Sequence, residues 1–338
     1  GGKDRVYAAL KFFIYTMVGS LFMFLAILYL YNHAGTFDLP LLLERLKTTH
    51  PLDGIQQFWL FLAFALSFAI KVPLFPLHTW LPDAHVQAPT AGSVVLAGVL
   101  LKMGTYGLLR FAIPLFPDAA MDLREEFCWL AVTGIIFGAC MALVQTDIKK
   151  LIAYSSVSHL GFVVLACFMT DVESLTGAIL QMVNHGLSTG MLFLMIGIIY
   201  ERRHTRELAD YGGLASVVPV YSVFFIIAVL SSIGLPGLNG FVGEFLILFG
   251  VFRADPLWGM LAATGVVLGA LYMLKMVKAF LFGPVVHEVN KEVKDLNMRE
   301  IIYLSPFVVL MVWLGLYPSS FTNLVEPTLS LYVQLLQN

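Results

Sequence analysis

Long apolar runs, separated by short polar stretches, dominate the pattern along this chain. A helix needs roughly 20 consecutive apolar residues to cross the hydrocarbon core of a bilayer. By that rule the pattern predicts about nine spans. They lie near residues 7–31, 55–83, 90–111, 127–144, 149–169, 174–200, 216–252, 257–282 and 299–317. We therefore expect an all-α polytopic membrane helical bundle that forms a single membrane domain over residues 1–338.

Two of these runs are longer than one crossing requires, and both are interrupted. The second breaks at Lys71-Val72-Pro73, and the seventh breaks at GLPGLNG, residues 234–240. Proline removes a backbone donor and clashes with the preceding turn, so it frees carbonyl groups at mid-depth. Such groups are tolerated in a membrane only where they are buried in protein or face a wet cavity. A pair of broken helices in the two halves of a chain is typical of an ion path, although two packing kinks would give the same pattern.

The composition agrees with a membrane protein and argues against several other classes. Hydrophobic residues make up 59% of the 338 residues and charged residues 12%, with a mean hydropathy of +0.84. Soluble domains carry about a quarter charged residues. A net charge of −2 gives no argument for a nucleic-acid partner.

The cysteines and the known cofactor motifs give no sign of a bound group. Cys128, Cys140 and Cys167 lack CxxC spacing, so we expect small buried hydrophobic residues and not a disulfide, a zinc site or an iron–sulfur cluster. No glycine-rich phosphate loop, catalytic triad spacing or haem ligand pair is evident in the sequence. We therefore expect neither a cofactor nor a metal ion in this chain.

The two ends of the chain differ in polarity. The opening GGKDR has the character of an interior loop, so we expect further spans to precede Gly1. The tail, residues 319–338, has one acidic residue, Glu326, and we expect no long additional helix there.

The loop charges predict the orientation of the bundle. If each broken run crosses the membrane once, ten lysines and arginines gather on one face, and four, or five with Arg110, lie on the other. The richer face holds Lys3, Arg5, Lys149, Lys150, Arg202, Arg203, Arg206, Lys291, Lys294 and Arg299. Cytoplasmic loops carry an excess of lysine and arginine. We therefore expect Gly1 on the cytoplasmic side and the C-terminus outside.

Five ionisable residues interrupt the apolar runs near mid-depth, each on a different predicted span. They are Lys71, Lys102, His159, His185 and Glu244. A charged side chain at the centre of a membrane helix costs roughly 2.5–3.5 kcal/mol on insertion scales. One such residue is often a packing histidine or half of a structural ion pair. Five of them across the bundle instead predict a function.

A row of ionisable groups in a dry environment suits a proton relay. Burial favours the neutral form of each group and a nearby opposite charge favours the charged form, so the movement of one neighbour changes which group holds the proton. We expect the five residues to form a hydrated track for protons. Three further candidates, His78, Asp83 and His85, lie toward the end of the second span and either line the mouth of a half-channel or cap helices.

Several long motifs resemble those of a known family. They are FPLHTWLPDAH at 75–85, APTAGS at 88–93, LLK at 100–102, DIKKLIAYSSVSH at 147–159 and GLPGLNGFVGE at 234–244. They are similar to the antiporter-like subunits of respiratory complex I, the proton-pumping NADH:quinone oxidoreductase, over essentially the whole chain. Glu244 favours the bacterial M (chain 4) branch, because the L and N branches generally carry lysine there. The expected absence of a long C-terminal helix also argues against the L branch.

The resemblance implies a fold of fourteen helices built on two inverted five-helix repeats. This chain would hold the sixth to the fourteenth helix. Residues 1–111 would end the first repeat, residues 127–282 would form the second repeat, and residues 299–338 would be the terminal span and tail.

The resemblance also implies a role for each of the five ionisable residues. Lys71 would be the central lysine of the first half-channel and Lys102 the linking lysine. His159 and His185 would continue a hydrated axis to Glu244, the terminal carboxylate of the second half. The acidic partner of Lys71 in the family is a glutamate on the helix before Gly1, outside this chain.

As a whole, the resemblance implies a membrane-arm subunit that moves protons while other subunits perform the redox chemistry. This chain would hold no redox centre, whereas NADH, FMN, iron–sulfur clusters and quinone would belong to the complete complex. Its partners would be the L and N subunits, the peripheral redox arm and the lipid of the bacterial inner membrane. Three alternatives stay open: a Mrp-type sodium/proton antiporter subunit, the membrane arm of an energy-converting hydrogenase, and a purely structural spacer.

Overall fold

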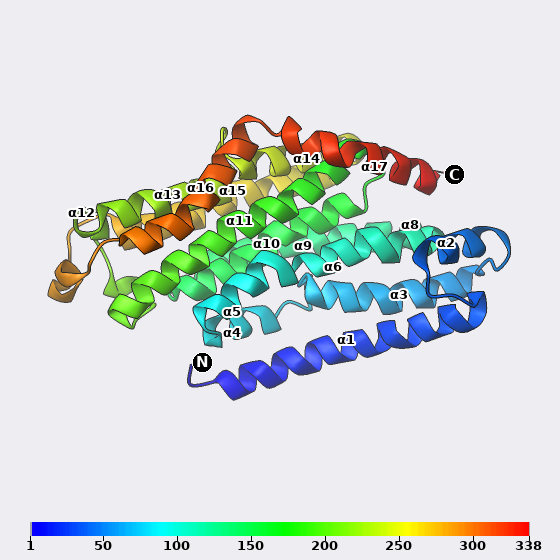
Figure 1. Ribbon diagram of the computed structural model, residues 1–338, viewed down its shortest axis with the longest axis horizontal. Coiled ribbons are helices and arrows are strands. Elements are labelled where there is room, and N and C mark those ends of the chain that lie inside the picture. Colours follow the sequence, from blue (N-terminus) through cyan, green and yellow to red (C-terminus); the bar gives the residue numbers. More distant parts are fainter. Residues whose placement is uncertain (1, 338) are drawn as a thin grey trace.

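The computed structural model describes residues 2–337, which form helices joined by short loops. Within that range, eight helical segments are long and apolar enough to cross a membrane. They are α1 (Arg5–Ala34), α3 (Gly54–Lys71), the run Thr90–Leu115, α9 (Arg124–Leu143), α10 (Ile148–Cys167), α11 (Val172–Arg203), α15 (Pro256–Leu281) and α16 (Met298–Leu316). They run between one end of the bundle that carries the N-terminus and an opposite end that carries the C-terminus (Figure 1). The prediction of an all-α membrane bundle is confirmed.

The seventh predicted span, residues 216–252, forms as two shorter helices. These are α13 (Pro219–Ser232) and α14 (Asn239–Ala254), and the break between them lies at the GLPGLNG motif. Gly234 and Gly237 have φ values of +72° and +94° there, which glycine adopts at little cost. Counted as one broken crossing beside the eight long segments, this pair gives the nine crossings expected.

The second predicted span is shorter than expected because its helix stops at the break. α3 ends at Lys71, and a loop leads to the separate helix α4 (Trp80–Gln87). The break leaves the carbonyl of Ile70 without its usual helical partner, and the buried indole of Trp80 donates a hydrogen bond to this oxygen at 2.9 Å. The carbonyl is thus satisfied by protein, as a dry environment requires.

The third crossing, Thr90–Leu115, departs from a regular α-helix. It contains α5 (Thr90–Val95), α6 (Lys102–Gly107) and α7 (Ile113–Leu115), joined by the π-helical turns Leu96–Leu100 and Leu108–Ala112. Single π-helical turns are rare and frequently mark functional sites. The first of them directly precedes Leu101 and Lys102.

The remaining elements are short or lie outside the long crossings. They are α2 (Leu39–Thr48), α8 (Pro117–Asp122), η3 (Leu208–Asp210), α12 (Leu214–Val217), η4 (Glu288–Glu292) and α17 (Ser319–Gln337).

The expectation of no long helix in the tail is wrong, because α17 occupies it. Leu329 and Val333 of α17 are buried, and the helix packs against α11 at the end of the bundle opposite the N-terminus (Figure 1). Polar residues such as Asn323, Glu326 and Ser330 interrupt it, so the segment lacks the continuous apolar run of a crossing. The tail therefore gives no support to the M branch.

α10 and α11 form the centre of the bundle. In their most apolar windows 89% and 78% of the residues are buried, against 17% in α1 and in α16. A small residue lets α9 approach α10 closely, because a Cβ on Gly161 would lie 2.9 Å from the carbonyl oxygen of Ala131. This arrangement places His159 of α10 and His185 of α11 deep inside the protein.

The three cysteines differ in burial. Cys128 and Cys167 are buried free thiols, as expected, whereas Cys140 is exposed. The expectation for Cys140 is wrong because α9 is only partly covered, and position 140 lies on its uncovered side.

Candidate functional site

The π-helical turn of the third crossing lies beside Lys102, whose side chain reaches α11. Lys102 Nζ is 2.6 Å from Nδ1 of His185 and also donates a hydrogen bond to the carbonyl of Ala97 in the π-helical turn. An ammonium group has three donors and no acceptor. A protonated Lys102 therefore donates to His185 Nδ1, and the ring hydrogen of neutral His185 is then on Nε2.

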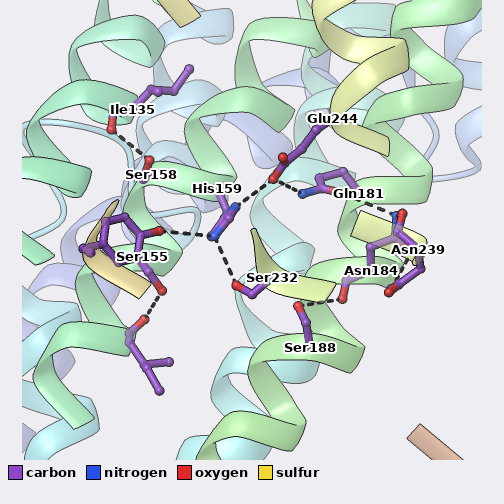
Figure 2. A network of polar contacts seen from close by, with 12 residues as sticks. Ile135, Ser155, Ser158, His159, Gln181, Asn184, Ser188, Ser232, Asn239 and Glu244 are labelled. Atoms are coloured by element: carbon purple, nitrogen blue, oxygen red, sulfur yellow. Dashed lines mark hydrogen bonds and ion pairs between the residues drawn. The ribbon is translucent and has the colours of Figure 1, made fainter. Parts of the chain in front are cut away.

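Glu244 and His159 form the second contact of the site. Glu244 lies just after the break, on α14, and its Oε1 atom is 3.1 Å from Nδ1 of His159 on α10. Gln181 of α11 donates to the same oxygen through Nε2, also at 3.1 Å (Figure 2). The side chains of Glu244 and His159 are 7% and 8% exposed. An isolated buried charge is costly, so these neighbours are what makes a carboxylate tolerable at this depth.

The two contacts face each other through their histidine rings. The ring centroids of His159 and His185 are 5.8 Å apart, and the ring planes make an angle of 61°. Nε2 of His159 has the hydroxyl groups of Ser232 and Tyr272 at 3.4 Å each, whereas Nε2 of His185 has no partner among the described residues. A hydroxyl group both donates and accepts, so these two suit either protonation state of His159.

The structure thus brings four of the five predicted site residues together, and we call them the central polar chain: Lys102, His185, His159 and Glu244. Lys71 stands apart from them. Its side chain is half-buried at the end of α3 and has no hydrogen bond or ion pair to any described residue. α3 and α6 nevertheless pack closely, since a Cβ on Gly104 would lie 2.8 Å from the backbone nitrogen of Val72.

The three secondary candidates have different surroundings. Asp83 forms an ion pair with Lys11 of α1 at 2.8 Å. His78 is buried among aromatic rings. His85 is fully buried and stacks on Phe193 with ring centroids 4.5 Å apart, and neither of its ring nitrogens has a partner in the described chain. No group of three or more His, Cys, Asp or Glu residues within residues 2–337 is placed to hold a metal ion.

Sequence reasoning missed a row of buried polar side chains that connects the second break to Glu244. We call it the amide chain: Ser231, Asn239, Asn184 and Gln181. Ser231 Oγ donates to Asn239 Oδ1 at 2.6 Å, and Asn239 Nδ2 donates to Asn184 Oδ1 at 3.1 Å. Asn184 Nδ2 donates to the Asn239 carbonyl at 2.7 Å. An unsatisfied buried amide costs about 1–3 kcal/mol, so these partners stabilise one another.

One pattern in the sequence indicated part of the amide chain. Gln181, Asn184 and His185 have the spacing i, i+3, i+4, which places them on one face of a helix.

Lys149 was predicted from the sequence to be one of the loop charges, but the structure buries it. Its side chain is only 7% exposed, and Nζ donates to the carbonyl of Ala88 at 2.6 Å. It therefore ties α10 to the loop before α5 instead of projecting freely from the surface.

Comparisons with known proteins place the chain among membrane subunits. A family profile described as NADH:quinone oxidoreductase/Mrp antiporter, TM, matches residues 1–269. NADH-quinone oxidoreductase subunit M of Rickettsia bellii is 47% identical over 323 residues, which cover 96% of this chain and 65% of the relative. The same subunit of Rhodobacter capsulatus is 46% identical over 343 residues, with coverage of 99% and 67%. The chain thus spans about two thirds of the length of these relatives.

Solved structures give the same answer for the fold. A chain of respiratory complex I from Thermus thermophilus with bound NADH matches with a TM-score of 0.93 at 37% identity, covering 99% of this chain and 70% of that one. A chain of the archaeal membrane-bound sulfane sulfur reductase matches with a TM-score of 0.87 at 27% identity, with coverage of 94% and 54%. A chain of the Mrp complex from Dietzia sp. shares the fold, with a TM-score of 0.86 at 18% identity and coverage of 98% and 70%. The chain therefore belongs to the NADH:quinone oxidoreductase/Mrp antiporter family of membrane subunits, in its subunit M branch.

Proposed function

We propose that the chain is a proton-translocating membrane-arm subunit of a bacterial NADH:quinone oxidoreductase, driven by redox chemistry in other subunits. One observation carries the proposal: two contacts, the partly buried Lys102–His185 and the buried His159–Glu244, face each other through histidine rings 5.8 Å apart. An imidazole accepts a proton at one nitrogen and releases a proton from the other. Two such rings between a lysine and a carboxylate form a relay.

In the proposed relay each step exchanges one proton between neighbouring atoms. Lys102 Nζ gives a proton to His185 Nδ1, and His185 releases the proton on its Nε2 atom. This proton crosses the gap to His159 Nε2 through a bridging water, which is nearly as favourable as a direct hydrogen bond. His159 then releases its Nδ1 proton to Glu244 Oε1. The net result is the movement of one proton from Lys102 to Glu244.

Lys71 is proposed as the group that supplies protons to Lys102. A lysine ammonium in a dry site keeps its proton while a carboxylate stays close and releases it when that charge is withdrawn. The close packing of α3 on α6 supports this role, because it brings the break at Lys71 next to the helix that begins with Lys102. His78, Asp83 and His85, which follow the break at Lys71 in the sequence, stay secondary candidates for the proton path.

The setting of the subunit is part of the proposal. The relatives carry the name NADH-quinone oxidoreductase subunit M, which supports assembly with L and N subunits in the bacterial inner membrane. NADH, FMN, iron–sulfur clusters and quinone would then bind to other subunits of the complex. The cation-rich face supports an orientation with Gly1 on the cytoplasmic side.

Two substitutions test the relay in the assembled complex. In inverted membrane vesicles, Lys102→Ala and Glu244→Gln should each lower proton uptake per NADH oxidised by at least about tenfold, because each removes one end of the relay. A pH-sensitive dye measures the uptake. Lys275→Ala is a matched control, because Lys275 also lies on an apolar crossing but is exposed and bonded only to the carbonyl of Leu143.

The alternatives predict other results. Full proton uptake in both variants would support a structural spacer and would contradict the relay. Exchange of sodium for protons driven by a gradient alone, with no dependence on NADH, would favour the Mrp-type function. Proton movement coupled to hydrogen formation would favour the hydrogenase-type membrane arm.

A further inference from the structure

The break between α13 and α14 touches the carboxylate of Glu244 directly. Gly234 has a φ of +72°, and a Cβ at this position would lie 2.7 Å from Glu244 Oε2. The carboxylate therefore occupies room that only a glycine leaves open. The shape of the break and the position of Glu244 are thus linked by contact.

The amide chain makes a second link between the break and Glu244. Its donors run in one direction, beginning with the bond from Ser231 to Asn239. From there they run from Asn239 to Asn184, from Asn184 to Gln181 at 3.5 Å, and from Gln181 to Glu244 (Figure 2). Because Asn184 donates to Oε1 of Gln181, the amino group of Gln181 is the end that faces the carboxylate. All four side chains are at most 3% exposed.

The amide chain joins three helices at one point. Ser231 lies in the last turn of α13, Asn239 begins α14, and Asn184 and Gln181 belong to α11. Asn239 contacts neither Glu244 nor His159 through its side chain, since its hydrogen bonds go to Ser231 and Asn184. A shift of α14 against α11 would break these bonds and turn the amide of Gln181 away from Glu244.

We propose that Asn239 is a positioning residue that, through Asn184 and Gln181, holds the Glu244 carboxylate within reach of His159 and couples this contact to the geometry of the broken helix. The proposal rests on the proposed relay function. It assigns a role in proton transfer to a residue that touches neither the donor nor the acceptor of the final step.

A double-mutant cycle tests whether Asn239 acts through Gln181. In the assembled complex, Asn239→Ser and Gln181→Leu should each lower proton uptake per NADH by about tenfold. The double variant should be no worse than Gln181→Leu alone, because both changes remove the same connection. Independent, multiplying losses would overturn the proposal.

A matched control and a gentler variant keep the test decisive. Asn290→Ser is the control, because Asn290 is equally buried but is bonded to Arg203 and Asp210 outside the site, and it should retain full proton uptake. Ser231→Ala removes only the first donor of the amide chain, so it should lower proton uptake about two- to threefold. This variant tests the proposal if Asn239→Ser does not assemble. Unchanged uptake in Ser231→Ala would then count against the proposal.

An infrared measurement separates positioning from a general effect on the fold. The carboxyl band of Glu244, identified by its loss in Glu244→Gln, should shift in Asn239→Ser and Ser231→Ala and stay in place in Asn290→Ser. A band unmoved in both amide-chain variants would overturn the positioning role. Full uptake in Glu244→Gln would instead overturn the relay itself, so the two failures are distinguishable.

Discussion

His159 connects the two halves of the site because its ring nitrogens have different neighbours. Nδ1 faces the carboxylate of Glu244, whereas Nε2 faces the hydroxyl groups of Ser232 and Tyr272. The hydroxyl groups donate to Nε2 when this nitrogen carries no proton and accept from it when it does. They therefore support both states that a relay must pass through.

Substitution of Tyr272 tests this role. Tyr272→Phe should lower proton uptake about fivefold, because it removes one of two hydroxyl groups near His159 and leaves the ring volume unchanged. Tyr221→Phe is the control: Tyr221 is also buried, and its hydroxyl donates to the Met195 carbonyl at 3.0 Å. That variant should lose about 1 kcal/mol of stability and keep its proton uptake. Equal losses of uptake in both variants would contradict the role of Tyr272.

At the scale of elements, the two broken helices use different means to satisfy the same physical requirement. In the first break, Trp80 donates to the free carbonyl of Ile70. In the second break, the backbone N–H groups of residues 233–235 donate to carbonyls in the last turn of α13, and Asn184 adds a donor to the carbonyl of Asn239 at the start of α14. Each break thus has backbone carbonyls paired within the protein, which is why a non-helical segment persists inside an apolar bundle.

Two glycines of the second break allow a controlled comparison. Gly234→Ala and Gly237→Ala both force a positive φ on alanine, at a cost of about 1–2 kcal/mol. Only the new Cβ at position 234 meets Glu244 Oε2, whereas position 237 has open space around it. Gly234→Ala should therefore lower proton uptake at least about tenfold, and Gly237→Ala should lower only the melting temperature. A similar uptake in the two variants would show that the contact with Glu244 is unimportant.

At the scale of the whole molecule, the cationic residues gather with acidic partners at the end that carries the N-terminus. Arg202 pairs with Glu300 at 2.6 Å, and Arg206 pairs with Asp147 at 3.3 Å. These pairs join the end of α11 to the start of α16, and the loop after α11 to the start of α10. They also concentrate charge at one face, which is the basis for the predicted orientation of the bundle in the membrane.

Chemical labelling tests that orientation. Cys140 is first replaced by serine, and single cysteines are introduced as Thr48→Cys on α2 and Glu292→Cys on η4, both exposed positions at opposite ends (Figure 1). A membrane-impermeant maleimide added to inverted vesicles should label position 292 and leave position 48 unlabelled. Right-side-out vesicles should give the reverse pattern. The opposite result in both preparations would place Gly1 outside the cell.

The sequence by itself determined the membrane bundle, its nine crossings and both breaks, because the length of an apolar run and the effect of proline are local properties of the chain. It also predicted Lys102, His159, His185 and Glu244 as candidate site residues, since a charged or imidazole group inside an apolar run is costly whatever its neighbours are. The sequence did not predict helix α17, because its burial depends on contact with α11, which is distant in the sequence.

Only the tertiary structure decided which polar groups meet. It joins Lys102 to His185 and His159 to Glu244 across separations of 83 and 85 residues, and it leaves Lys71 outside this chain of contacts. The hydrogen bonds of the amide chain are likewise known only from the tertiary structure. Asparagine and glutamine carry no charge, so their presence in a helix says little until a neighbouring helix is seen to supply the partner that their burial requires.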